Sequence, residues 1–301
     1  MRAITVKGVR IDDTFAEAFT MRATAVVITA DSARWARQAA VTMTGFATSV
    51  IGAGCEAGID AEISPRETPD RRPGVRALLF AMSTGELQKQ LQNRVGQCVL
   101  TTVGSACYAG LEGEETLKLG SSLRFFGDGW QVSKRLGRKH YWRVPVMDGE
   151  FVCEASTGLT KNAVGGGNLL IMGASAQATL AAAEAAASAI NAVPDVIMPF
   201  PGGIVRSGSK VGSKYKAPAS TNEAYCPTLR GAVTSALDPD VASVLEIVID
   251  GLTPDAVAAA MRAGLAAIIR LGPKRGAARV GAGNYGGKLG PHHFHLKDLL
   301  P

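Results

Sequence analysis

The sequence predicts an α+β fold made of duplicated ferredoxin-like lobes, with an inserted loop region and bridging β-hairpins. Three observations lead to this prediction. The order strand–helix–strand–strand–helix–strand, which defines the ferredoxin-like unit, can be read twice along the chain. The second copy carries a long segment that has neither helical nor strand periodicity. The residues between the copies alternate polar and aromatic side chains around glycine-containing turns, which is typical of β-hairpins.

The first copy is expected between residues 25 and 103. Short apolar runs predict its four strands, at residues 25–30 (AVVITA), 46–52 (FATSVIG), 75–82 (VRALLFAM) and 98–103 (CVLTTV). Asp31 is the expected N-cap of the first helix, which would end at Gly45. Ser83 and Glu86 have capping-box spacing, so a second helix is expected to begin there and to end at Gly96.

The second copy repeats the pattern between residues 168 and 283. Its strands are expected at residues 168–173 (NLLIMG), 204–208 (IVRSG, a weak strand), 244–250 (VLEIVID) and 278–283 (ARVGAG). One helix is expected to occupy residues 175–193. Thr253 and Pro254 place an N-cap and a first-turn proline at the start of the other helix.

A long basic loop distinguishes the second copy from the first. The helix starts lie 52 residues apart in the first copy (Ser83 minus Asp31) and 78 apart in the second (Thr253 minus Ser175). The segment Phe200–Thr228, rich in Gly, Pro, Ser and Lys, accounts for the excess. Compact domains seldom keep loops longer than about 12–15 residues unless the loop has a function. Its cationic side chains predict an anionic ligand; they are Arg206, Lys210, Lys214 and Lys216, with Arg230 just beyond.

The predicted hairpins occupy residues 123–154, around Gly-Asp-Gly and Leu-Gly-Arg turns. We therefore expect an N-terminal lobe with a hairpin extension in residues 1–149. A C-terminal lobe with the inserted loop is expected in residues 150–301.

Composition indicates a folded, reduced protein. The chain has 301 residues, of which 47% are hydrophobic and 19% charged, as in globular domains. Neither a secretory signal nor a membrane-spanning apolar run is apparent, and five scattered cysteines include no C-x-x-C pair, so a cytoplasmic location is expected. The net charge of +6 is compatible with a nucleic acid or with an acidic small molecule as ligand.

Several motifs match a known pattern but lack its structural context. Residues 281–286 (GAGNYG) fit the dinucleotide-binding pattern, yet no helix is expected after them. Residues 203–210 (GIVRSGSK) resemble a phosphate-binding loop with the wrong order at its end, and Ser207–Lys210 fit S-x-x-K without a helix. Of the histidines at positions 292, 293 and 295, only His293 and His295 would face the same side of a strand, and two imidazoles without a carboxylate or thiol are too few for a typical zinc site. The expected strands lack the aromatic residues of an RNA-binding sheet.

The chain resembles the formylmethanofuran–tetrahydromethanopterin formyltransferase family from about Gly8 to Leu300. Many long blocks match in the right order, which is more specific than any single block. They are residues 13–19 (DTFAEAF), 44–51 (TGFATSVI), 56–60 (EAGID), 67–75 (ETPDRRPGV), 94–99 (RVGQCV), 125–129 (FFGDG), 200–214 (FPGGIVRSGSKVGSK), 219–228 (ASTNEAYCPT), 246–252 (EIVIDGL) and 282–290 (AGNYGGKLG).

This resemblance implies two ferredoxin-like lobes from a duplication and an assembly into homodimers or homotetramers. It implies formyl transfer between methanofuran and tetrahydromethanopterin as co-substrates, without a metal and without a tightly bound cofactor. The basic, Ala/Arg-rich composition is more similar to relatives from methylotrophic bacteria. There the resemblance implies other subunits of a formyltransferase/hydrolase complex as partners, in the oxidation of formaldehyde.

Glu246 is the expected catalytic acid/base, because a carboxyl group among apolar strand residues is expected to have a raised pKa. Glycine-rich backbone and polar side chains are expected to stabilise the oxyanion, and cationic groups to meet the acidic tails of the coenzymes. The expected substrate-binding residues are Gly202, Gly203, Arg206, Ser209, Lys210, Lys214, Asn222, Tyr225, Asp13 and Thr14. Asp13, Thr14 and Glu17 could equally well have a capping or packing role.

Two other interpretations stay open at this point. One is a scaffold subunit of the same complex that keeps the fold without the chemistry, against which Glu246 and the intact glycine-rich loop argue. The other is an RNA-binding ferredoxin-like protein, which the basic charge allows but the expected strands do not favour.

Overall fold

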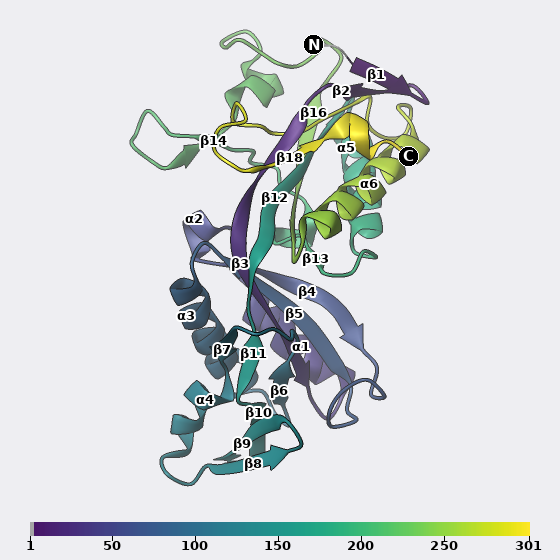
Figure 1. Ribbon diagram of the computed structural model, residues 1–301. Helices are drawn as coiled ribbons and strands as arrows, with labels where there is room; N and C mark the ends of the chain where they lie inside the picture. The colour runs from purple at the N-terminus through teal and green to yellow at the C-terminus, as the bar shows by residue number, and fades with distance from the viewer. Residues whose placement is uncertain (1–2) are drawn as a thin grey trace. The chain divides into compact units, whose positions relative to one another are not determined.

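A computed structural model describes residues 3–301 and shows a mixed α+β protein (Figure 1). The chain divides into two compact units. One contains the residues up to Thr20 together with Val164–Pro301, and the other contains Met21–Ala163. The chain changes from one unit to the other within β3 (Phe15–Thr29) and within β12 (Thr160–Gly173). No helix in residues 3–301 is long and apolar enough to cross a lipid bilayer.

The unit Met21–Ala163 is built on an antiparallel sheet with the strand order β4–β5–β3–β6. Its elements follow β3 in the order α1 (Ala33–Thr44), β4 (Glu56–Ile63), β5 (Gly74–Ala81), α3 (Thr84–Arg94) and β6 (Ala106–Ala109). Alternate strand residues such as Ile28 and Leu79 pack against Ala40 and Met43 of α1 and Leu91 of α3. One sheet face and the two helices therefore form the core of this unit.

The rest of this unit consists of short elements and the predicted hairpins. β8 (Val132–Leu136), β9 (Lys139–Val146) and β10 (Gly149–Glu154) pair as consecutive antiparallel strands, which confirms hairpins in residues 132–154. Residues 124–127, which were predicted to belong to the hairpins, form a 3-10 turn instead. β10 continues the sheet by pairing in parallel with β6. The remaining elements are α2 (Val50–Ala53), β7 (Thr116–Lys118), α4 (Gly120–Leu123) and β11 (Ser156–Gly158).

The other unit has the strand order β13–β16–β12–β17–β2–β1, in which only the pair β17–β2 is parallel. Its elements are β1 (Ala3–Val6), β2 (Val9–Asp12), α5 (Ala176–Ile190), β13 (Val196–Ile197), β16 (Ser243–Gly251), α6 (Pro254–Leu271), β17 (Arg279–Gly281) and β18 (His292–His295). β18 pairs with residues 15–18 at the start of β3. A small hairpin, β14 (Lys210–Val211) with β15 (Ala219–Ser220), lies in the basic loop.

The alternation of side chains along β12 and β16 decides which residues are available for chemistry. Leu169 and Ile171 of β12 and Ile247 of β16 belong to the core formed with α5 and α6, which lie side by side in Figure 1. Because successive strand residues point to opposite faces, Asn168, Leu170 and Glu246 project from the other face. The basic loop and the segment after it cover part of that face.

Most helix starts are where the sequence predicts them. The side chains of Ser83, Ser175 and Thr253 each accept a hydrogen bond from the backbone N–H three residues later. The first helix is different, because Ser32 occupies the N-cap position expected for Asp31. The Asp31 carboxylate forms an ion pair with Arg72, whose Nη1 lies 2.8 Å from Asp31 Oδ1.

Three predicted strands are wrong in position. Residues 46–52 contribute only an isolated bridge at Thr48 and then begin α2, in which the Ser49 side chain accepts a hydrogen bond from the N–H of Ile51. The second strand of the first copy is therefore β4. Residues 98–103 continue the preceding helix as a π-helical turn and a bend, because buried Val95 and Val99 have helical spacing. The fourth strand of the first copy is β6 instead. In the second copy the strand is β13, and residues 204–208 contribute only a bridge from Val205 to Glu246.

Candidate functional site

A pocket of about 300 Å³ lies under the basic loop, on the face of β12 and β16 opposite to α5 and α6. Its residues come from β12, from the start of the loop, from residues 222–226, from β16 and from residues 283–285. The pocket is thus built within the unit that holds Val164–Pro301. The lining residues are Asn168, Leu170, Val205, Arg206, Ser207, Gly208, Ser209, Lys210, Asn222, Tyr225, Cys226, Val244, Leu245, Glu246, Gly283, Asn284 and Tyr285.

Glu246 is held on the pocket wall by its own backbone. Its N–H donates to the carbonyl oxygen of Val205 at 2.9 Å, and the Val205 N–H donates to the carbonyl oxygen of Glu246 at 2.7 Å. On its other side, β16 pairs with β12 so that Glu246 faces Leu170. The first residues of the basic loop therefore lie directly beside the carboxyl group that the sequence analysis selects.

The environment of Glu246 favours the neutral form of its carboxyl group. Burial raises its pKa to about 7, although the hydrogen bond from Asn168 lowers it in part. The Asn168 Nδ2 donates to Glu246 Oε1 at 3.2 Å. A carboxyl group with a pKa near neutrality can both accept and release a proton at physiological pH, as an acid/base catalyst must.

Tyr285 brings a phenol to the same pocket. Burial raises the pKa of Tyr285, the nearby Glu246 raises it further, and a hydrogen bond with the side chain of Ser209 lowers it. The Tyr285 ring lies against Phe19, with ring centroids 6.3 Å apart. Its backbone N–H donates to Glu17 Oε2 at 2.7 Å. The sequence analysis did not select Tyr285, which belongs to the glycine-rich motif at residues 281–286.

The cationic loop residues divide between two neighbouring pockets. Arg206 and Lys210 line the pocket of Glu246, and the Lys210 Nζ forms an ion pair with Glu223 Oε1. A second pocket of about 440 Å³ contains Lys210, Lys214 and Tyr215, together with several hydroxyl groups. Lys210 thus faces both pockets. Lys216, also in the loop, is exposed and lines neither pocket.

Four of the expected site residues lie outside the lining of both pockets. Gly202 and Gly203 form a turn with backbone φ angles of 64° and 79°, values that favour glycine. Asp13 lies 3.6 Å from Lys297. Thr14 is nearer to the chemistry, because its Oγ1 accepts a hydrogen bond at 2.8 Å from the side chain of Asn284, which lines the pocket.

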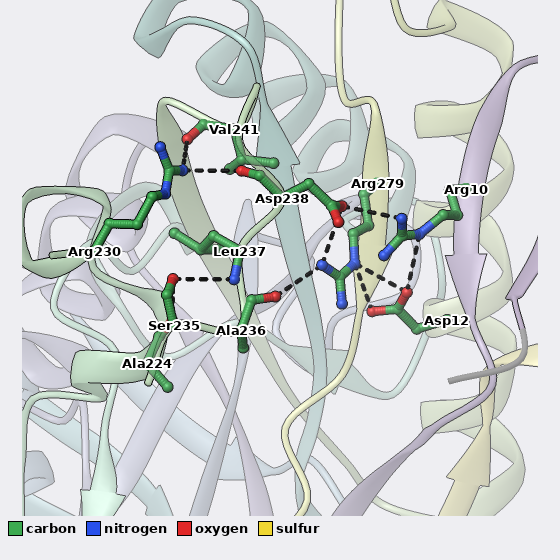
Figure 2. A network of polar contacts seen from close by, with 10 residues as sticks. All are labelled: Arg10, Asp12, Ala224, Arg230, Ser235, Ala236, Leu237, Asp238, Val241 and Arg279. Carbon is green, nitrogen blue, oxygen red and sulfur yellow. Dashed lines mark hydrogen bonds and ion pairs between the residues drawn. The ribbon is translucent and has the colours of Figure 1, made fainter. Parts of the chain in front are cut away.

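Arg230 has a different role from the one that its charge suggests. Its guanidinium donates to the backbone carbonyl oxygens of Asp238, Pro239 and Val241. Figure 2 shows Arg230 and the residues from Ser235 to Val241, which lie between Arg230 and Arg279. The Arg230 guanidinium therefore holds the backbone of this segment, where its charge alone suggested contact with an anionic ligand. These carbonyl contacts could not be read from the sequence.

Arg279 connects this segment to the sheet. Its Nε lies 2.9 Å from both carboxylate oxygens of Asp12. Its Nη1 donates to the carbonyl oxygen of Ala236 at 2.9 Å and lies 3.2 Å from Asp238 Oδ2 (Figure 2). Arg10 adds a second ion pair to Asp238. The network fixes the polypeptide that covers the pocket face of the sheet.

Asn168 and Asn284 are two further polar residues of the pocket that were not among the expected site residues. Asn284 belongs to the glycine-rich motif at residues 281–286, which does not fit a dinucleotide site but contributes three residues to this pocket. Asn168 begins an apolar strand run, where an amide side chain is unusual. A polar residue at the edge of such a run was the available signal.

The other unit has a larger groove of a different character. This groove, of about 700 Å³, is lined mainly by apolar residues such as Leu100, Phe126 and Met147. Its carboxylate, Asp148, accepts a hydrogen bond from the backbone N–H of Gly104. Polar groups suited to acid–base chemistry are thus gathered in the pocket of Glu246 instead. The residues from 3 to 301 contain no group of three or more His, Cys, Asp or Glu side chains placed to bind a metal ion.

Two protein-family models match this chain. The model described as "Formylmethanofuran-tetrahydromethanopterin formyltransferase" matches residues 4–146. The model described as "FTR, proximal lobe" matches residues 149–299.

Individual relatives match along the whole length. The formylmethanofuran–tetrahydromethanopterin formyltransferase of Methylococcus capsulatus is 60% identical over 98% of this chain and 99% of the relative. A subunit of the formyltransferase/hydrolase complex of Methylorubrum extorquens is 58% identical over 100% of this chain and 98% of the relative. A solved structure of that complex with methylofuran contains a polypeptide that matches with a TM-score of 0.97 and 57% identity, over 100% of this chain and 99% of that one.

Proposed function

This chain belongs to the formylmethanofuran–tetrahydromethanopterin formyltransferase family, and we propose that the pocket of Glu246 is its active site. The protein is an acyltransferase of one-carbon metabolism that moves a formyl group between methanofuran and tetrahydromethanopterin, which are its substrates. The observation that supports the location is the half-buried carboxyl group of Glu246, with its raised pKa, beside the basic loop.

The reaction is a direct acyl transfer. A nitrogen atom of the acceptor coenzyme attacks the formyl carbon and forms a new C–N bond, so that the carbonyl oxygen becomes negatively charged. The tetrahedral intermediate then collapses, the old C–N bond breaks, and the departing nitrogen takes a proton. Glu246 accepts the proton of the attacking amine and returns it to the departing nitrogen, so the enzyme is unchanged at the end.

The oxyanion requires hydrogen-bond donors that are already in place. Ser209, Asn222 and the backbone of the glycine-rich loop supply such donors in the pocket. Gly202 and Gly203 set the path of this loop with their left-handed turn. Thr14 holds the side chain of Asn284, and its neighbour in the sequence, Asp13, belongs to the same unit.

The cationic residues recognise the acidic parts of the coenzymes. Arg206 and Lys210 in the first pocket, and Lys214 in the second, are placed to meet carboxylate or phosphate groups. Asn222 and Tyr225 orient the part of the coenzyme that lies in the first pocket.

The two halves of the chain are copies of one ferredoxin-like ancestor, with a boundary between residues 149 and 150. Both halves contain the order strand–helix–strand–strand–helix–strand along the chain. Across the sheets their strands lie in the orders β4–β5–β3–β6 and β13–β16–β12–β17. In each, the strand that comes first in the copy lies third in the sheet order, between the third and fourth strands. The loop between β13 and β16 is the insertion in the second copy.

The chain works with other subunits of a formyltransferase/hydrolase complex, as its Methylorubrum relative does. We propose that it passes formyl groups to methanofuran in the oxidation of formaldehyde, and that it also associates with itself. Five cysteines without a disulfide agree with a cytoplasmic location. A scaffold role without chemistry is the alternative.

Assay of the purified chain with both coenzymes decides between these roles. We expect formyl transfer in the absence of other subunits, and a loss of turnover in Glu246→Gln with little change in coenzyme binding. Absence of transfer by the folded wild-type chain would favour the scaffold role. Near-normal turnover by the Gln variant would remove Glu246 from the mechanism and leave the activity itself in place.

A further inference from the structure

The side chain of Asn168 is held from both ends. Its Oδ1 accepts a hydrogen bond from the backbone N–H of Gly283 at 2.8 Å. Its Nδ2 donates to Glu246 Oε1 at 3.2 Å. A backbone N–H can only donate, so it must face the amide oxygen, and the NH₂ group must then face Glu246. The orientation of this buried amide (4% exposed) is therefore fixed by the fold.

Gly283 is shaped for this contact. A Cβ atom at position 283 would lie 2.8 Å from Asn168 Nδ2, closer than real side chains approach one another. The absence of a side chain thus gives the amide the room it occupies beside Glu246. Two independent features, the N–H of residue 283 and its missing Cβ, point to the same placement of Asn168.

We propose that Asn168 is a positioning residue for the formyl transfer, and that it directs the transferred proton to Oε2 of Glu246. An oxygen atom that accepts a hydrogen bond from an NH₂ group is the poorer place for a proton, because the NH₂ group can only donate. Oε1 remains the acceptor, and Oε2 exchanges the proton with substrate. The inference rests on the proposed function, since it requires Glu246 to be the acid/base.

The step needs no further reactant. When the new C–N bond forms, the proton of the attacking nitrogen moves to Oε2. When the old C–N bond breaks, the same proton moves from Oε2 to the departing nitrogen. Asn168 keeps its hydrogen bond to Oε1 in both steps. The other ionisable residues that line this pocket stay unchanged in the test below; they are Arg206, Lys210, Tyr225, Cys226 and Tyr285.

The test replaces Asn168 by an isosteric acid. Asn168→Asp retains an acceptor for Gly283 but places a second carboxyl group against Oε1. We expect kcat to fall by about 10²-fold, the lower end of acid–base contributions, with the KM of each coenzyme nearly unchanged. The acid limb of the kcat–pH profile should move to higher pH, because a neighbouring negative charge disfavours ionised Glu246. Asn162→Asp is the matched control, on the same strand but exposed.

A second variant guards against a folding defect. Asn168→Ser keeps a hydroxyl group without adding a charge, and we expect it to retain more turnover than Asn168→Asp when both variants are assayed below their thermal unfolding midpoints. A kcat and pH profile in both variants equal to those of Asn162→Asp would overturn the proposal. A rise in KM without a fall in kcat would also overturn it, since Asn168 would then only bind substrate. If Glu246→Gln retains full turnover, the failure lies in the proposed active site instead.

Discussion

The carboxylate of Glu17 accepts a hydrogen bond from the backbone N–H of Tyr285 at 2.7 Å. The same carboxylate accepts three more, from the backbone N–H groups of Gly287, Leu289 and Gly290. The N–H of Glu17 donates in turn to the carbonyl oxygen of Gly283. One buried side chain thus shapes the segment that supplies both Tyr285 and the N–H that orients Asn168.

Glu17 and Glu246 show how surroundings separate two identical functional groups. Burial tends to raise the pKa of both. In Glu17 the four backbone N–H groups outweigh burial and lower the pKa to about 2, so the group stays ionised. Glu246 has one amide donor, and its pKa remains at about 7. The first carboxylate is suited to holding structure, and the second to exchanging protons.

Glu17→Gln should loosen the segment at residues 283–290. The amide oxygen of Gln can replace one carboxylate oxygen. The NH₂ group of Gln, however, would face the backbone N–H groups whose hydrogen bonds the other carboxylate oxygen accepts in the wild type. Each buried donor left without a partner costs about 1–3 kcal/mol. We expect a lower urea midpoint and lower kcat. Glu112→Gln is the control, because Glu112 is exposed, and its urea midpoint and kcat should be unchanged. Equal urea midpoints for the two variants would contradict the role of Glu17.

Glu17 also predicts how stability changes in acid. Its pKa in the folded protein lies below the ordinary value of 4.5, so its contribution is complete above about pH 4.5 and is lost as the pH falls toward 2. Urea unfolding of wild type and Glu17→Gln should therefore differ most near neutral pH and converge at low pH. A difference that stays constant down to pH 2 would show that ionisation of Glu17 contributes nothing.

Glu246 predicts the opposite behaviour. Its folded pKa, about 7, lies above 4.5, so the neutral carboxyl group stabilises the fold fully below pH 4.5, and this contribution is lost as the pH rises through 7. Glu246→Gln should therefore be more stable than wild type at pH 8 and nearly equal to it at pH 4.5. Its kcat should be lower by about 10²–10⁴-fold, the range for an acid–base group. Urea midpoints at the two pH values and kcat at pH 8 test both statements.

The sequence was sufficient for features that depend on local chemistry. Ser83, Ser175 and Thr253 cap helices because their hydroxyl groups meet N–H groups three residues away. Glu246 could be selected because a carboxyl group in an apolar strand run is unusual, and other expected residues line its pocket or the neighbouring one. Those residues are Arg206, Ser209, Lys210, Asn222, Tyr225 and, in the second pocket, Lys214.

Features that depend on distant partners were not accessible. Asn168 reaches Glu246 and Gly283 only because β12 pairs with β16 and β17. Arg230 meets backbone carbonyls, which leave no trace in residue type. The strand predicted at residues 98–103 was wrong because a short apolar run fits a strand or a helix end equally well, and here it continues the π-helical turn at Val95–Val99.

Lys210 should govern coenzyme affinity rather than chemistry. It lines both pockets, and its pairing with Glu223, which lowers the pKa of Glu223, keeps it at their junction. Lys210→Gln should raise the KM of a coenzyme about tenfold, which corresponds to about 1.4 kcal/mol for a charge-assisted hydrogen bond. Added salt should raise the wild-type KM more than that of the variant. Lys216→Gln is the control, and an equal rise in its KM would point to general charge.

Asp12 and Arg279 should stabilise the unit that contains the pocket. Both are buried, at 4% and 7% exposure, and Arg279 Nε lies 2.9 Å from both Asp12 oxygens (Figure 2). Asp12→Asn would leave the guanidinium buried with less compensation, and breaking such a pair costs about 3–5 kcal/mol.

The adjacent residue provides a control for this pair. Asp13 is exposed and lies 3.6 Å from Lys297, so Asp13→Asn should change the free energy of unfolding by at most about 1 kcal/mol. Urea unfolding measures both variants, and similar losses would mean that the Asp12–Arg279 pair adds little. Because Arg279 also bonds to Ala236 and Asp238, Asp12→Asn should shift the segment over the pocket as well. A rise in coenzyme KM at temperatures where the variant is fully folded would reveal that shift.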